Sequence, residues 1–336
     1  MVKNFLEDVW KLSRRVYPKC YNFSTAKTKF YFKEHVQIPV PALSVRPGNI
    51  TCLESHSSRS AWFYVPWRSG DQWYPGIEYK GIGFEGQKIR LLNRFAWGGV
   101  ELPTALAEHN LSKIAFNAGV FCQRPVGCYD YGTFEGKKLA VIARTFASPL
   151  RLSDFLFETD ILNAYLAIRK QTEKEYCNYL ASTLGKSIRK MFDIGLYHGA
   201  MELNNITTEG EIADFEPTYG GTWEGVMPNT EPRFRVLALY RLFSDIDHIL
   251  PNRKKYFITS FARAFLQSDR PIPAKQSEKK IVEAYIGKKL TKKNLFIEFP
   301  PRENFDTAIQ ILKHELAQSK TETQRQRIAY LINQLS

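Results

Sequence analysis

The stretch from Gly195 to Pro217 reads GLYHGAMELNNITTEGEIADFEP. Its parts follow one another as a His-Gly turn at 198–199, a polar loop that ends in Asn204 and Asn205, a β-like run over 206–213, and then Asp214. In phosphoryl-transfer sites, a loop Asn and the Asp that follows the next β segment hold the metal ions that bridge the nucleotide phosphates. We therefore predict that Asn205 and Asp214 are metal ligands. A buried hairpin with a capping Asn is the alternative interpretation.

The composition is that of an ordinary globular protein. The chain has 336 residues, of which 44% are hydrophobic, so it can bury the core of one large or two smaller domains. The 47 Lys and Arg against 34 Asp and Glu give a net charge of +13. This excess favours an anionic ligand, and nucleotide phosphates, nucleic acid and acidic protein surfaces all fit it.

The cysteines and the N-terminus indicate the compartment. The five cysteines are scattered, without a C-x-x-C pair, which argues against a zinc site or a disulfide framework. We expect reduced thiols in a cytoplasmic protein, with Cys122 and Cys128 packed in the core. The N-terminal segment carries Glu7 and Asp8 and is not a signal peptide. No run approaches the roughly 20 apolar residues of a membrane span, so we expect no membrane partner.

The first half of the chain predicts a small sheet that carries one helix. Residues 1–47 begin with a short amphipathic helix and continue into an extended, proline-broken segment, which we interpret as an extension that caps the edge of the sheet. Three β-rich runs follow between residues 50 and 79. Lys80 ends the last run, and Glu108 lies in a segment with helical periodicity. A strand Lys paired with a helix Glu positions the phosphate-binding ammonium of kinase-type sites, so we predict that these two side chains form an ion pair.

The second half is predicted to be mostly helical. Apolar residues at helical spacing over 180–192 predict the long helix that leads into the polar loop, and the hinge between the two lobes is expected near 148–157. Residues 217–232 are rich in Gly, Pro and Thr and suggest an active-site lid. Basic clusters over 254–293 alternate with aromatic residues. We favour a solvated helical face over an RNA-binding surface there, and residues 305–335 predict two further amphipathic helices.

The sequence resembles the SelO family of protein adenylyltransferases, which have a protein-kinase-like fold. Six residues carry the resemblance, in this order along the chain: Lys80, Glu108, Arg144, Arg151, Asn205 and Asp214. The resemblance covers about residues 75–250, and the nine-residue step from Asn205 to Asp214 and the seven-residue step from Arg144 to Arg151 match the family pattern. It implies an α+β, bilobal fold with a small antiparallel-sheet N-lobe (48–150), a larger helical C-lobe (151–300) and C-terminal helices (301–336). ATP and Mg²⁺ or Mn²⁺ would be its cofactors.

The resemblance also implies roles for individual residues. In nucleotide binding, Lys80 would contact the phosphates and Glu108 would position the Lys80 ammonium, and Gly98, which lies before the helix, would contact the nucleotide. Arg144 and Arg151 would grip phosphate oxygens as bidentate forks and hold ATP so that its α-phosphate faces the acceptor. Arg151 as a surface charge is the alternative interpretation.

The sequence departs from the family at three points. Asn204 replaces the Asp that accepts the proton, and an Asn amide cannot do so at neutral pH. Glu202 or Glu216 would then replace the base, unless the acceptor is already anionic or ATP is bound without turnover. Trp97 replaces an Asp, and residues 55–61 lack the glycines of a phosphate-covering loop.

Three functions therefore stay open. The first is transfer of AMP from ATP to a hydroxyl of a protein or small molecule, the second is phosphoryl transfer by a kinase, and the third is a nucleotide-binding pseudokinase scaffold. Nucleic acid as a partner is possible but not favoured.

Overall fold

The computed structural model describes residues 2–17, 20–23, 30–33, 50–54, 60–81, 89–91, 94–96, 100–134, 136–157, 159–215, 218–220 and 232–286, and the single positions 313, 317, 325 and 329. Gly98, Trp97 and Glu216 lie outside the described residues, as do nearly all of the expected lid and C-terminal helices.

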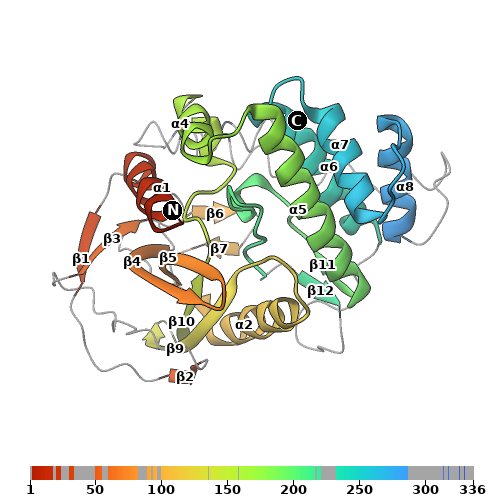
Figure 1. The fold of residues 1–336 in the computed structure, drawn as a ribbon. Coiled ribbons are helices and arrows are strands. Elements are labelled where there is room, and N and C mark those ends of the chain that lie inside the picture. Colours follow the sequence, from red (N-terminus) through yellow and green to blue (C-terminus); the bar gives the residue numbers. More distant parts are fainter. Residues whose placement is uncertain are drawn as a thin grey trace.

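An antiparallel sheet forms one part of the molecule (Figure 1). Its strands lie in the order β1 (Cys20–Phe23), β3 (Ile50–Glu54), β4 (Ser60–Ser69), β5 (Gln72–Lys80), β10 (Lys137–Thr145), β9 (Arg124–Phe134) and β2 (Phe30–Lys33), with β8 (Val100–Glu101) paired to β10. The short strands β6 (Ile89–Leu91) and β7 (Arg94–Ala96) pair separately. Two residues connect β4 to β5, and Gly70 has a φ of 57° in this turn, a conformation that glycine adopts without steric cost. The predicted β runs are confirmed.

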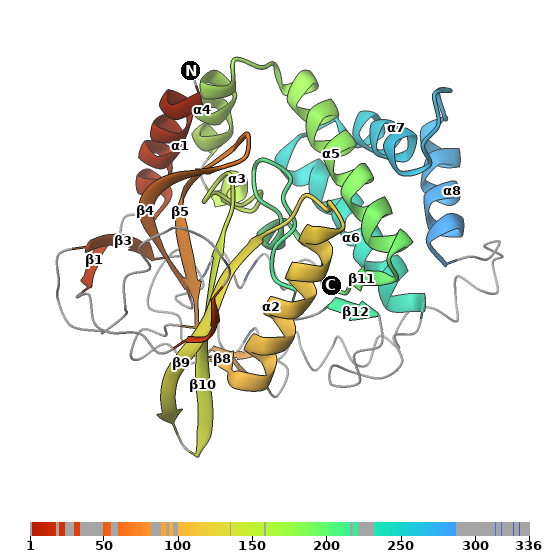
Figure 2. The same ribbon diagram turned by 60° about the horizontal axis from the view of Figure 1, so that its bottom comes forward.

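Two helices pack on the sheet. Helix α2 (Leu102–Asn117) runs alongside β9 and β10 (Figure 2), and it confirms the helix predicted around Glu108. Helix α1 (Val2–Val16) lies beside α4 in both views and also contacts β5. At the end of α1, the Tyr17 hydroxyl donates to Asp154 Oδ2 at 2.6 Å. The N-terminal helix therefore connects the sheet to the helical part, and it is more than a cap on the sheet edge.

The helical part contains α3 (Asp154–Phe157), α4 (Thr159–Arg169), α5 (Glu173–Asp193), α6 (Pro232–Ile249), α7 (Lys254–Phe265) and α8 (Ala274–Ile286). A capping box begins α5, because the Glu175 amide donates to the Thr172 hydroxyl and the Thr172 amide donates to the Glu175 carboxylate. Leu180, Leu184 and Ile188 are fully or almost fully buried along α5, as their spacing predicts. One core therefore includes the apolar face of α5 together with residues of α1, α6 and α7.

The stretch from Gly195 to Pro217, called the decisive stretch from here on, follows α5. Strand β11 (Leu196–His198) pairs with β12 (Thr218–Gly220), and the 3-10 helix η1 (Leu203–Asn205) lies between them in the sequence. Isolated bridges join Ile206 to Ile212 and Ile212 to Cys122. The predicted loop and β-like run are present, and they lie against the segment that leads from α2 into β9.

Candidate functional site

Lys80 lies between two carboxylates. Its Nζ is 2.5 Å from Glu108 Oε2 and also forms an ion pair with Asp214 Oδ1. The Lys80 and Glu108 side chains are 4% and 0% exposed, so this pair is shielded from water. The ion pair predicted between the strand Lys and the helix Glu is confirmed, and the structure adds the Asp of the decisive stretch to the same ammonium.

A second carboxylate, Glu78, organises the two arginines. Alternation along β5 places Glu78 on the same face as Lys80, and the β5–β10 register places it opposite Arg144. Its Oε2 accepts from Arg144 Nε at 2.8 Å and from Arg151 Nη2 at 3.0 Å, and its Oε1 accepts from the Ser60 hydroxyl at 2.7 Å. Burial by itself raises the pKa of Glu78, but the guanidiniums outweigh burial and hold the pKa below its usual value.

Arg144 is held by protein groups. Besides its bond to Glu78, its Nη1 donates to Glu108 Oε1 at 2.6 Å and to Gln123 Oε1 at 2.8 Å. These donors already have carboxylate and amide acceptors, so the direct phosphate grip that we predicted for Arg144 requires that one of these acceptors be displaced.

Arg151 and Arg144 both lie over the ring of Phe146, and they differ in the acceptors of their guanidinium nitrogens. The Cζ of Arg151 lies 4.2 Å from the centroid of the Phe146 ring, in a cation–π contact. Its Nη1 is buried, and no acceptor for it is found among the described residues. The interpretation of Arg151 as a surface charge is wrong, because its side chain is only 11% exposed.

Gln123 joins the two halves of the site. Its Oε1 accepts from Arg144 Nη1 at 2.8 Å and from the Asp214 amide at 3.0 Å, and its Nε2 donates to Glu108 Oε1 at 3.3 Å. The orientation of the Gln123 amide is fixed, because the first two partners can only donate and the third accepts.

Asp214 and His198 determine the shape of the loop. Asp214 has a φ of 62°, a left-handed conformation that costs a non-glycine residue about 1 kcal/mol and occurs often at functional sites. His198 Nδ1 accepts from the Ala200 amide at 3.2 Å, so its Nε2 carries the proton and donates to the Ala213 carbonyl at 2.9 Å. Burial lowers the pKa of His198. The neutral imidazole therefore holds Ala213 and Asp214 against the polar loop.

The donor chemistry of Asn205 and Asp214 fits a hard cation. Asn205 Nδ2 donates to the Ala200 carbonyl at 2.9 Å, which leaves the amide oxygen as the donor atom for a metal. Mg²⁺ is commonly held through one or two such oxygens together with substrate phosphates. Within the described part of the chain, no group of three or more His, Cys, Asp and Glu forms a metal cluster. Nucleotide phosphates and water would complete the coordination of a Mg²⁺ held by these two residues.

Solvent reaches Asn204 and the candidate base Glu202 in the polar loop. Asn204 is exposed, and Glu202 accepts from Arg241 of α6 at 2.8 Å. Ala200 occupies the position two residues after His198 where kinases carry their base. Glu202 is the one carboxylate in the described loop from His198 to Asn205, and Arg241 already binds it.

The buried acid Glu211 connects the loop to the segment around Ala147. The two oxygens of Glu211 share the single N–H of Ala147, at 2.8 and 2.9 Å, and Oε2 also accepts from the Thr207 hydroxyl at 3.2 Å. Burial raises the pKa of Glu211 to about 8. This acid ties the hairpin of the decisive stretch to the segment that carries Arg151.

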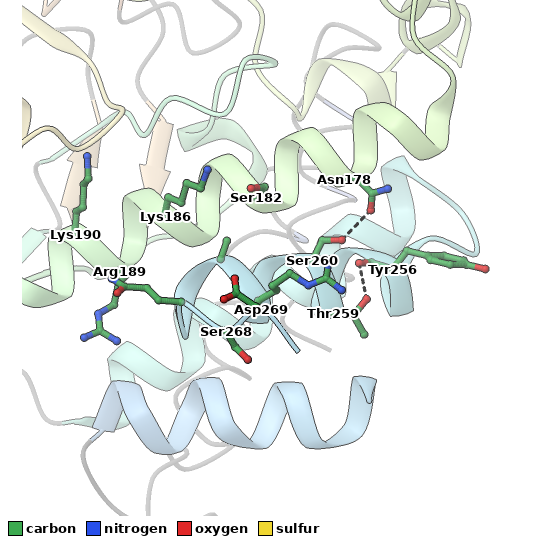
Figure 3. A pocket seen from close by; sticks show the side chains of 13 residues that line it. Asn178, Ser182, Lys186, Arg189, Lys190, Tyr256, Thr259, Ser260, Ser268 and Asp269 are labelled. Atoms are coloured by element: carbon green, nitrogen blue, oxygen red, sulfur yellow. Dashed lines mark hydrogen bonds between the residues drawn. The ribbon is translucent and has the colours of Figure 1, made fainter. Parts of the chain in front are cut away.

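A separate groove of about 910 Å³ lies between α5 and α7 (Figure 3). Lys186, Lys190, Arg189 and Arg263 contribute positive charge to it, and Asp269 is its one carboxylate. The aromatic residues predicted to alternate with the basic clusters, Phe257, Phe261 and Phe265, are each 0% exposed. They cannot stack on bases, which agrees with a solvated helical face. The groove contains none of the site residues discussed above.

Two residues of the site were missed in the sequence. Glu78 could have been found, because it lies two positions before Lys80 in a β run and must share its face. For Gln123 the sequence offers no comparable signal. Gly98 lies outside the described ranges, and its role stays a prediction.

Comparisons with known proteins give no family assignment. No protein-family model matches this chain, and no curated protein matches it. One similar solved structure is WaaP in complex with acyl carrier protein, with 13% identity, 71% of this chain and 86% of that chain covered, and a TM-score of 0.35. Another is ROP2 from Toxoplasma gondii, a virulence factor with a protein-kinase fold and no enzymatic activity. It has 14% identity, with 93% of this chain and 88% of that chain covered, and a TM-score of 0.35.

The fold is assigned from the order and packing of the elements in this structure. Within the described ranges, no helix combines the length and apolar character needed to cross a membrane. The antiparallel sheet with its helix, the Lys80–Glu108 pair and the loop that leads to Asp214 follow one another in the order that kinase-type sites require. The chain has an α+β, bilobal, protein-kinase-like fold.

Proposed function

We propose that this chain is an ATP- and divalent-metal-dependent transferase that moves AMP from ATP to a hydroxyl acceptor on a protein or small molecule. Nucleotide binding is supported by Lys80, whose ammonium lies between Glu108 and Asp214. In kinase-type sites this lysine contacts the phosphates. Asn205 and Asp214 would hold Mg²⁺ or Mn²⁺, which would neutralise the charge of the phosphates.

The observation that supports AMP transfer is the buried Nη1 of Arg151, for which the described residues provide no acceptor. A kinase directs the γ-phosphate at the acceptor. A guanidinium fixed inside the site favours the opposite orientation, with the β- and γ-phosphates inward and the α-phosphate at the acceptor. A charge-assisted hydrogen bond contributes roughly 1.5 to 3 kcal/mol, which is enough to decide between two poses.

The reaction forms a bond from the acceptor oxygen to the α-phosphorus. The bond between the α-phosphorus and the oxygen that bridges to the β-phosphate breaks, and pyrophosphate leaves. The hydroxyl proton has to pass to a base, and Glu202 is our candidate for it. In that role Glu202 would have to leave Arg241, to which it is bound.

A nucleotide-binding scaffold without turnover is the second candidate. Three observations favour it: Ala200 at the usual base position, an exposed Asn204, and Glu202 bound to Arg241. A conventional kinase reaction would meet the same lack of a base.

Labelled ATP distinguishes these functions. The full-length chain is incubated with Mg²⁺ or Mn²⁺ and with ATP labelled at the α- or the γ-phosphate, and the chain and added acceptors are analysed by mass spectrometry. We expect α-label and a mass gain of AMP in the product. The γ-label in product would establish a kinase, and bound nucleotide without labelled product would establish the scaffold.

A further inference from the structure

An alternating network of charges fills the site. The order of its contacts is Arg151, Glu78, Arg144, Glu108, Lys80 and Asp214, so every contact joins a cation to an anion. This ion-pair network contains three cations and three anions and is therefore neutral. The whole chain has a net charge of +13, but the six residues that would surround the phosphates have a net charge of zero.

One oxygen of Glu78 occupies the anion position between the two guanidiniums. Its Oε2 accepts from both Arg144 and Arg151, at 2.8 and 3.0 Å. Phosphate oxygens are recognised by the same guanidinium edges that bind carboxylates. Because the Glu78 side chain is only 3% exposed, water does not screen its charge from a phosphate placed beside Lys80.

We infer that Glu78 is a resident counter-ion, a residue that stabilises the arginines before nucleotide binds and exchanges for a phosphate oxygen when it binds. This inference rests on the proposed function to the extent that nucleotide phosphates enter beside Lys80. It makes Glu78 a specificity-determining residue, because its charge opposes each added phosphate group. A purely positioning carboxylate would have the opposite effect, since its loss would disorder the arginines and weaken phosphate binding.

The test compares ligand affinities by calorimetry in the full-length chain with Mg²⁺. The ligands are adenosine, AMP, ATP and inorganic tripolyphosphate. For Glu78→Gln we expect ATP and tripolyphosphate to bind about tenfold to a hundredfold more tightly, which corresponds to about 1.4 to 2.8 kcal/mol. AMP should gain less, and adenosine should stay unchanged. Glu101→Gln is the matched control, because Glu101 is an exposed partner of Lys137, and it should bind all four ligands as the parent does.

A milder variant covers the case in which Glu78→Gln does not fold. Ser60→Ala removes the 2.7 Å hydrogen bond to Glu78 Oε1 and keeps the charge. Because a hydrogen bond of this kind contributes about 1 kcal/mol, the carboxylate should exchange more readily and ATP affinity should rise roughly threefold to fivefold. Weaker or unchanged binding of ATP in the folded variant would overturn the inference.

The outcomes separate this inference from the proposed function. ATP binding that tightens as expected, without any labelled product, would support the counter-ion and reject AMP transfer. Transfer of AMP together with weakened ATP binding in Glu78→Gln would do the reverse. A parent chain that binds neither ATP nor tripolyphosphate would reject both.

Discussion

Removing the charge of Glu108 should strongly destabilise the protein. Its side chain is fully buried, with Oε2 accepting from Lys80 at 2.5 Å and Oε1 accepting from Arg144 at 2.6 Å. Glutamine has nearly the same shape but only one acceptor atom, so in Glu108→Gln the new NH₂ group must face one of these two donors. Breaking a buried pair from one side costs about 3 to 5 kcal/mol. Lys80 keeps Asp214 and Arg144 keeps Glu78, which places the expected loss near 3 kcal/mol, at the lower end of that range.

Urea unfolding followed by circular dichroism measures this effect. With a slope of about 3 kcal/mol per molar urea, a loss near 3 kcal/mol lowers the midpoint by about 1 M. The control is Glu101→Gln, in which the lost ion pair with Lys137 is exposed and contributes between about 0 and 1 kcal/mol. If Glu108→Gln unfolds at the same urea concentration as this control, the buried network does not stabilise the fold and our reasoning is refuted.

Three further predictions concern the metal, the pH dependence and a helix contact. Asp214→Asn should abolish the Mg²⁺ dependence of ATP binding measured by calorimetry without unfolding the chain, and an unchanged dependence would contradict the proposed metal site. The pKa of Glu211, raised to about 8 in the folded state, means that the native chain holds a proton that the unfolded chain releases near pH 4.3. The free energy of unfolding should therefore fall as pH rises from about 5 to 8. In Glu211→Gln, urea unfolding at about pH 5 and about pH 8 should show a smaller fall. A fall as large as that of the parent would exclude Glu211 as its source. In Gly185→Ala the new Cβ would lie 2.6 Å from the Phe261 carbonyl oxygen, so we expect a loss of about 1 to 3 kcal/mol in place of the usual gain on replacing a helical glycine; a higher melting temperature would show that α5 and α7 do not approach as described.

Local patterns explain which parts of the site could be predicted. The periodicity around Lys80 and Glu108 identified a strand and a helix, and the known chemistry of a Lys–Glu pair connected them. The role of Glu78 was missed because its partners depend on the register between β5 and β10, which sets it opposite Arg144. The pairing register between two strands cannot be read from the sequence of either strand alone.

The N-terminal helix shows the same limit. Its apolar spacing predicted an amphipathic helix, and residues 2–16 form one. The spacing does not say what the apolar face contacts. In the structure Val9 and Leu12 belong to the same buried cluster as Trp62, Phe146 and Leu150, so the helix helps to build the core between the two lobes.

The geometry of Asp214 depends on α2 in two ways. Lys80 holds the Asp214 carboxylate and pairs with Glu108 of α2, while Gln123 accepts from the Asp214 amide and donates to the same Glu108. The left-handed conformation of Asp214 is unfavourable for a non-glycine residue and persists only where the surroundings hold it. Since both contacts involve partners of Glu108, a displacement of α2 would disturb the contacts of the Asp214 side chain and of its backbone together. The position of α2 and the conformation of Asp214, the proposed metal ligand, are therefore coupled.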